Sequence, residues 1–172
     1  NPSLVGSEMC IRDSINVIHY KEIDSTNNEA KKLINGQKDL PCWIIADKQT
    51  SGRGRKDRFW DSPIGNFMGT YVLTIKGEKR ILPQLSFVSA LAIHNTIMDF
   101  RPEDSSEIML KWPNDIIINN KKCGGILIEN IFSKDNSNHI IAIGIGINLK
   151  SSPLHSTFPV SYTHLRAHET RI

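Results

Sequence analysis

Short apolar runs rich in β-branched residues fill most of the chain between residues 15 and 150, and only two segments show helical periodicity. Such runs, bounded by Gly, Pro, Asn or Asp, predict strands. The expected strands are residues 15–20, 42–50, 66–75, 107–112, 115–118, 123–132 and 139–149, with a hairpin around residues 119–122. The order β-α-β-β-α-β-β-β-β predicts an α+β domain with a mixed sheet and its helices packed on one side.

Capping residues and periodicity define the two helices. Ser25, Thr26 and Asn27 suit the start of the first helix, which Gly36 would stop. Pro83 suits the first turn of the second helix, which would end near Phe100. The second helix has a wide apolar face, so we expect it to pack centrally against the sheet. That face consists of Leu85, Val88, Leu91, Ala92, Ile97 and Met98.

Length and charge indicate one domain with a local anion site. The chain of 172 residues is long enough to bury a sizeable core. Its net charge of +3 is accounted for by the cations of residues 53–58, so no general polyanion-binding surface is implied. No apolar run approaches the ~20 residues that span a bilayer. The three cysteines form no metal-binding or disulfide pattern, which predicts a cytoplasmic protein.

Both ends of the chain look foreign to this domain. Residues 1–14 and 160–172 show no periodicity and resemble translated adapter sequence. We therefore expect a non-native leader at 1–14, a domain at 15–159 and a non-native tail at 160–172.

The segment Gly52-Arg53-Gly54-Arg55-Lys56-Asp57-Arg58-Phe59-Trp60 carries most of the chemistry that the sequence shows. Glycines allow close backbone approach to a ligand, and guanidinium groups match phosphate oxygens. A phosphate-bearing ligand is one interpretation. A flexible RNA- or DNA-binding segment and an ordinary solvated basic loop have similar composition.

Four further motifs accompany this basic loop, here defined as residues 52–60. They are Ser25-Thr26-Asn27, Gln49 three residues before Gly52, Lys111-Trp112-Pro113-Asn114-Asp115 with Lys122-Cys123-Gly124-Gly125, and Gly144-Ile145-Gly146-Ile147-Asn148. In order and spacing over residues 15–150, the set resembles the catalytic domain of biotin protein ligases. The resemblance implies a fold like that of class II aminoacyl-tRNA synthetases. It also implies that biotin is adenylated with ATP and Mg²⁺, then transferred to a lysine of a biotin carboxyl carrier domain, and it allows a homodimer.

The resemblance also implies the site residues. For biotin they are Ser25, Thr26, Asn27, Gln49, Arg53, Gly54, Arg55, Lys122 and Gly125. Lys122 and Arg55 would be catalytic, with Lys122 near the biotin carboxylate and the α-phosphate, where a cation stabilises developing charge. For ATP and the adenylate they are Arg55, Arg58, Trp60, Asn114, Asp115 and Asn148, and Asp115 is also the Mg²⁺ candidate.

Plainer interpretations remain open for several of these residues. Ser25 and Thr26 would serve equally as helix caps, although that leaves Gln49 unexplained. Lys122 would otherwise be an exposed hairpin lysine, as we expect Lys121 to be. For Trp112 core packing is the preferred interpretation.

Two departures from the family pattern affect the expected activity. Asp57 stands where the family usually has glycine, and its negative charge near phosphates would weaken loop closure or nucleotide affinity. The small C-terminal barrel domain of the family does not follow Leu149, and no helix-turn-helix precedes Ile15, so DNA binding is not expected of this chain.

Two rival functions are considered. A lipoate or octanoate ligase or transferase shares the fold class but carries a different Arg-Arg and Gly-Gly-Gly signature. A nucleic-acid-binding module predicts interleaved aromatic and basic residues over a whole face, whereas only Phe59 and Trp60 lie near the basic loop.

Overall fold

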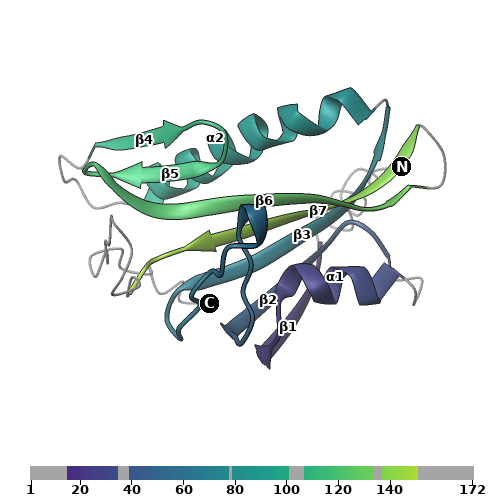
Figure 1. The fold of residues 1–172 in the computed structure, drawn as a ribbon, viewed down its shortest axis with the longest axis horizontal. Coiled ribbons are helices and arrows are strands. Elements are labelled where there is room, and N and C mark those ends of the chain that lie inside the picture. Colours follow the sequence, from purple (N-terminus) through teal and green to yellow (C-terminus); the bar gives the residue numbers. More distant parts are fainter. Residues whose placement is uncertain (1–14, 35–38, 78, 101–106, 134–136, 151–172) are drawn as a thin grey trace, which may run out of the picture.

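The computed structural model describes residues 15–34, 39–77, 79–100, 107–133 and 137–150, and its strands form one sheet (Figure 1). The strands are β1 (Asn16–Ile23), β2 (Cys42–Gln49), β3 (Phe67–Lys76), β4 (Ile108–Lys111), β5 (Asp115–Ile118), β6 (Lys121–Ser133) and β7 (Asn138–Ile147). The helices are α1 (Thr26–Ile34), α2 (Leu82–Phe100) and two short 3-10 turns, η1 (Arg55–Asp57) and η2 (Lys79–Ile81). The predicted element order is confirmed. The expected leader and tail, and Gly36, lie outside the described residues.

The sheet is mixed, as predicted, with strand order β1-β2-β3-β7-β6-β5-β4. Only β1 and β2 run parallel, because α1 connects them and returns the chain to the same end of the sheet. All other neighbouring strands are antiparallel. The β5–β6 hairpin turns at Asn119 and Asn120, whose φ angles of 48° and 62° are those of a tight two-residue turn. Lys121 and Lys122 therefore belong to β6 rather than to the turn.

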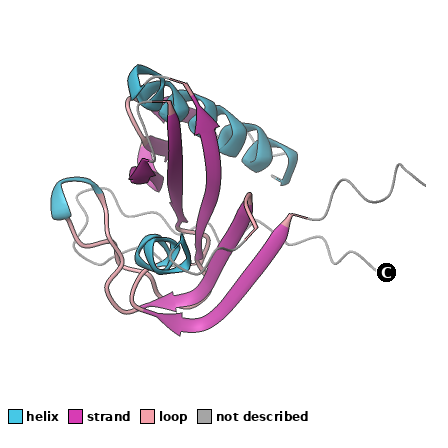
Figure 2. Ribbon diagram, turned by 90° about the vertical axis from the view of Figure 1, so that its right-hand side faces the viewer, coloured by secondary structure: helices cyan, strands magenta, loops and turns pink. Residues whose placement is uncertain are grey.

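The expectation that both helices lie on one side of the sheet is wrong. Side chains alternate between the two faces of a strand, and on β7 Ala142 packs with Ala30 of α1 whereas Ile141 and Ile143 pack with α2. The helices thus cover opposite faces, and Figure 2 shows α1 and α2 separated by strands. The order of elements does not reveal this arrangement. A central strand with two apolar faces is compatible with helices on one face of the sheet or on both.

Helix α2 buries a narrower stripe than its sequence predicts. Ala90, Ile93 and Ile97 are buried in one cluster with residues of β5, β6 and the central strand β7. Most of the contacts of α2 with the sheet are nevertheless with β4, β5 and β6, on the outer half of the sheet. Val88 and Leu91, which we expected in the core, are exposed, because α2 is apolar on more than the one side that meets the sheet. Among the described residues, no helix is long and apolar enough to cross a membrane.

Candidate functional site

A cavity of about 690 Å³ opens on the face of the sheet that α1 covers, and its volume suits a small-molecule ligand. Its walls come from the basic loop, the start of α1, the end of β2 and the strands β5, β6 and β7. Thirteen of the fourteen predicted site residues line it: Ser25, Asn27, Gln49, Arg53, Gly54, Arg55, Arg58, Trp60, Asn114, Asp115, Lys122, Gly125 and Asn148. Thr26 does not line the cavity and contacts Gln49 instead.

Glycines on β7 form the floor of this cavity. A Cβ atom at Gly144 would collide with the amide of Asn27, and one at Gly146 would lie 2.6 Å from Cε2 of Trp60. Only glycine therefore lets α1 and the indole ring approach the sheet this closely. This close approach explains why the motif Gly144-Ile145-Gly146 has glycine at these two positions of β7.

Gln49 has a structural role that the sequence left unexplained. Its Oε1 accepts hydrogen bonds from the backbone N–H of Thr26 at 2.8 Å and from the Thr26 hydroxyl at 3.1 Å. The first of these satisfies one of the free N–H groups at the start of α1. Its Nε2 donates to Ser62 Oγ at 2.8 Å. Gln49 therefore caps the helix from a neighbouring strand and holds the uncharged polar wall of the cavity, formed by Ser25, Asn27 and Gln49, in place.

The basic loop folds as a small hairpin over the cavity. Gly54 N–H donates to the Arg58 carbonyl at 2.7 Å, and Trp60 N–H donates to the Gly52 carbonyl at 2.9 Å. At the tip, Lys56 and Asp57 have φ angles of 56° and 55°, a left-handed conformation that aspartate tolerates better than most residues. Asp57 is exposed and does not line the cavity, so the geometry does not support the expected repulsion between its carboxylate and phosphates.

Lys122 points into the cavity because β6 contains a bulge. The register with β5 shifts between Ile116 and Ile117, which leaves Cys123 as an extra residue in β6. Cys123 is fully buried in the core cluster beneath α2, and Lys122 is thereby turned to the same face as Gly125. Lys122 Nζ donates to Asp115 Oδ1 at 2.7 Å and lies 5.6 Å from the centre of the Trp60 ring. The exposed hairpin lysine is Lys121, as expected.

A hydrogen bond joins the tip of the basic loop to the β4–β5 turn on the other side of the cavity. Arg55 Nη1 donates to Asn114 Oδ1 at 2.9 Å. Asn114 is itself fixed, because its side chain donates to the Ile126 carbonyl and its own carbonyl accepts from the Ile126 N–H, both at 2.9 Å. The tip of the loop thus rests on the opposite wall.

The three-dimensional arrangement and the motif set agree with a family match over most of the chain. A model of the biotin/lipoate A/B protein ligase family matches residues 20–148. The chain belongs to this family.

Relatives within this ligase family confirm the resemblance to biotin protein ligases. The biotin–[acetyl-CoA-carboxylase] ligase of Paracoccus denitrificans is 42% identical over 130 residues, which are 76% of this chain and 53% of that protein. The Leishmania major biotin protein ligase in complex with biotinyl-5-AMP superposes with a TM-score of 0.71 at 27% identity, over 86% of this chain and 63% of that one. The Aquifex aeolicus enzyme in complex with biotin and ATP gives 0.61 at 33% identity, over 78% and 52%. The chain thus spans about half the length of the Paracoccus protein.

The two tryptophans of the ligase motifs occupy different environments. Trp60 lies in the cavity against Gly146, where the sequence predicted it. Trp112, which we expected in the core, is 72% exposed in the turn between β4 and β5. Trp112 is therefore not a core residue.

Sequence reasoning missed Glu129, although it follows the Lys-Cys-Gly-Gly motif on the same strand, β6. Burial opposes ionisation of Glu129, but hydrogen bonds from Asn27, Lys31 and Arg53 outweigh it and hold the pKa of the carboxyl below its usual value. An acid directly after the apolar run Ile126-Leu127-Ile128 was the available signal. Thr70 and Asn66, both buried, were missed as well; Asn66 donates to Asn148 Oδ1 and so fixes that cavity residue.

No cluster of three or more His, Cys, Asp or Glu side chains that would hold a metal ion occurs in the described parts of the chain. The acids lining the cavity are Asp61 and Asp115. Mg²⁺ bound to nucleotide phosphates usually takes one or two carboxylates, so this pair is chemically compatible with a phosphate-bound ion.

Proposed function

We propose that this chain adenylates biotin with ATP and passes the biotinyl group to a lysine of a biotin carboxyl carrier domain. The single observation that carries the proposal is the place of Lys122. It projects from the bulge in β6 between an uncharged polar wall and a cation-rich wall of one cavity.

The two walls suit the two substrates. Ser25, Asn27 and Gln49 offer neutral donors and acceptors for a ureido ring, and Gly54 adds backbone groups. On the other side, the cavity is lined by Arg55, Lys56, Arg58 and Lys111, which match the negative charge of a triphosphate. Trp60 offers an aromatic face to adenine, and Asn148 offers hydrogen-bonding groups to the edge of the base.

In the first step the biotin carboxylate attacks the α-phosphorus of ATP, an acyl phosphate bond forms, and pyrophosphate leaves. Lys122 neutralises the repulsion between the two anions and the charge that develops at phosphorus, and Arg55 assists from the loop. In the second step the amine of the carrier lysine attacks the acyl carbon and AMP leaves. Asp115 would hold Mg²⁺, which would supply charge neutralisation.

The loop hairpin serves to protect the mixed anhydride from water between the two steps. The Arg55–Asn114 contact closes the tip against the far wall, and a closed site excludes competing hydrolysis. The carrier lysine then enters when the tip opens.

Two further assignments follow from the same proposal. Cys42 and Cys123 are both buried, and burial raises the pKa of Cys123 to about 11, so Cys123 is not a reactive thiol. This fits a reducing cytoplasm, where carboxylases and their carrier domains work. A homodimer is compatible with the exposed edges of β1 and β4.

Calorimetry with biotin and with lipoate tests the choice of substrate. Biotin should bind and lipoate should not, because a dithiolane ring cannot use the polar groups of Ser25, Asn27 and Gln49 and would leave them unpaired. Tighter binding of lipoate would assign the chain to the lipoate branch of the family.

A further inference from the structure

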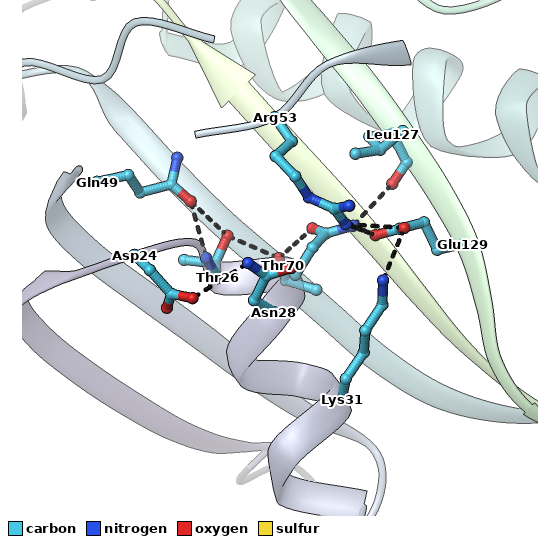
Figure 3. A network of polar contacts seen from close by, with 10 residues as sticks. Asp24, Thr26, Asn28, Lys31, Gln49, Arg53, Thr70, Leu127 and Glu129 are labelled. Atoms are coloured by element: carbon cyan, nitrogen blue, oxygen red, sulfur yellow. Dashed lines mark hydrogen bonds and ion pairs between the residues drawn. The ribbon is translucent and has the colours of Figure 1, made fainter. Parts of the chain in front are cut away.

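Glu129 joins three separate elements on the cavity face of the sheet. From β6, its carboxylate accepts hydrogen bonds from Asn27 Nδ2 at 2.8 Å and Lys31 Nζ at 3.0 Å, both on α1. Arg53 Nη2 of the basic loop lies 2.8 and 2.7 Å from its two oxygens. Figure 3 shows Lys31 and Arg53 converging on this carboxylate. Only 22% of the Glu129 side chain is exposed, so these contacts are partly shielded from water.

A chain of polar contacts continues from Glu129 to the other end of the basic loop. Asn27 Oδ1 lies 2.7 Å from the hydroxyl of Thr70, which is fully buried and also lies 2.8 Å from the Thr26 hydroxyl. Thr26 donates to Gln49, which in turn donates to Ser62. The Ser62 hydroxyl donates to the Trp60 carbonyl at 3.1 Å. Both ends of the loop, Arg53 and Trp60, are therefore connected through the polar wall of the cavity.

This chain of polar contacts from Glu129 to Trp60, called the circuit below, divides the basic loop into two parts. The base, residues 52–54 and 59–60, is held by Glu129, by the circuit and by its own backbone bonds. The tip, residues 55–58, touches the far wall through the Arg55–Asn114 hydrogen bond, and all four of its side chains are exposed. The Arg53 side chain therefore belongs to the base, which Glu129 holds, whereas Arg55, Lys56 and Arg58 belong to the exposed tip.

We propose that Glu129 is a positioning residue that fixes the base of the basic loop through Arg53, and so fixes the cavity wall that holds the neutral ring of the substrate. The inference rests on the proposed function for its kinetic consequence. The anchor itself is a property of the ligand-free protein. Loosening it misplaces Arg53, Gly54 and Asn27, which line the cavity, and leaves the cations of the tip unchanged.

Limited trypsin digestion of the ligand-free protein tests the anchor without any activity. Cleavage after Arg53 requires its guanidinium to leave Glu129 and enter the protease, whereas Arg55, Lys56 and Arg58 are exposed. In the wild type we expect cleavage in the tip and little after Arg53. In Glu129→Gln, cleavage after Arg53 should be about ten-fold faster, since opening of the anchor controls it.

Lys31→Ala is the matched control, because Lys31 contacts the same carboxylate but does not touch the loop. Its cleavage pattern should be that of the wild type. If Lys31→Ala reproduces the effect of Glu129→Gln, or if Glu129→Gln leaves Arg53 as protected as before, the anchor does not exist. Should Glu129→Gln fail to fold, Glu129→Asp keeps the charge with a shorter reach and should show intermediate cleavage.

Steady-state kinetics separate positioning from mere support of the fold. Glu129→Gln should raise the KM for biotin about ten-fold and leave kcat within about two-fold, as expected when a binding interaction and not a transition-state interaction is lost. A loss of thermal stability with an unchanged KM would assign Glu129 a structural role only. If the wild type forms no adenylate, the proposed function fails, and the digestion still decides whether Glu129 anchors the loop.

Discussion

At the scale of single residues, the bulge in β6 assigns two neighbouring lysines to different environments. Lys122 faces the cavity and pairs with Asp115, whereas Lys121 is exposed outside it. If β6 paired regularly with β5, without the bulge at Cys123, Lys122 would share a face with Gly124 and point toward the core beneath α2. The proposed catalytic role of Lys122 thus depends on this bulge.

Replacing Lys122 by alanine should reduce the rate of adenylation by ~10²–10³, the usual cost of losing one preorganised group at a developing charge. Its melting temperature should change little, because an exposed or half-exposed lysine is usually worth less than ~0.5 kcal/mol of stability. Pyrophosphate release and thermal melting measure the two effects. Lys121→Ala is the control and should behave as the wild type. Equal behaviour of the two variants would mean that Lys122 is only a surface residue.

Asp57 illustrates how backbone geometry changes an expectation drawn from charge. Because its side chain lies outside the cavity at the tip of the loop, Asp57→Gly should leave the release rate of labelled adenylate within about two-fold. Glycine removes the cost of a left-handed φ, which is ~1 kcal/mol for an ordinary residue and less for aspartate. Release that slows by ten-fold or more would show that the carboxylate does reach the phosphates.

At the scale of elements, the basic loop combines an anchored base with an exposed tip. Trypsin cleavage at Arg55, Lys56 and Arg58 should be suppressed when biotin and ATP are added together, because the adenylate draws these cations inward. Each ligand alone should protect less than the pair. Cleavage of the tip at the same rate in all conditions would argue against a loop that closes over the product.

The junction of β6, α1 and the loop should make folding stability sensitive to acid. The pKa of Glu129 is lower in the folded protein than in the unfolded chain, so its stabilising contribution is present above the unfolded pKa of ~4.3 and is lost as the pH falls through the folded value. At pH 7 the free energy of unfolding of the wild type should exceed that of Glu129→Gln by ~1.5–3 kcal/mol, which is the range for hydrogen bonds to charged groups. Urea unfolding at decreasing pH below ~4.3 should show that the difference narrows. A difference that persists there would mean that packing, not charge, is what the substitution removes.

At the scale of the whole molecule, local patterns predicted the elements and motif order predicted the site. Strand runs such as Cys42–Gln49 are fixed by local apolar composition and turn residues, so their positions follow from the sequence. The resemblance brought Ser25, Gln49 and Lys122 together although they are far apart along the chain, and the structure places all three in one cavity.

Features that depend on long-range packing were not predictable in the same way. The two faces of β7 are both apolar, so periodicity does not say which helix each one meets. The exposure of Trp112 depends on what covers the β4–β5 turn, which no local pattern encodes. Glu129 acquires its role only through partners that are 76 to 102 residues away in the sequence.

The central claim is that one cavity brings a biotin carboxylate against the α-phosphate of ATP. Mixing the protein with biotin, ATP and Mg²⁺ and detecting the product by mass spectrometry tests it directly, with lipoate in place of biotin as the matched control. The account predicts biotinyl-5′-AMP in the first mixture, its loss in Lys122→Ala and no lipoyl-AMP in the second. Formation of lipoyl-AMP without biotinyl-5′-AMP, or of neither product by a protein that binds both biotin and ATP, would contradict it.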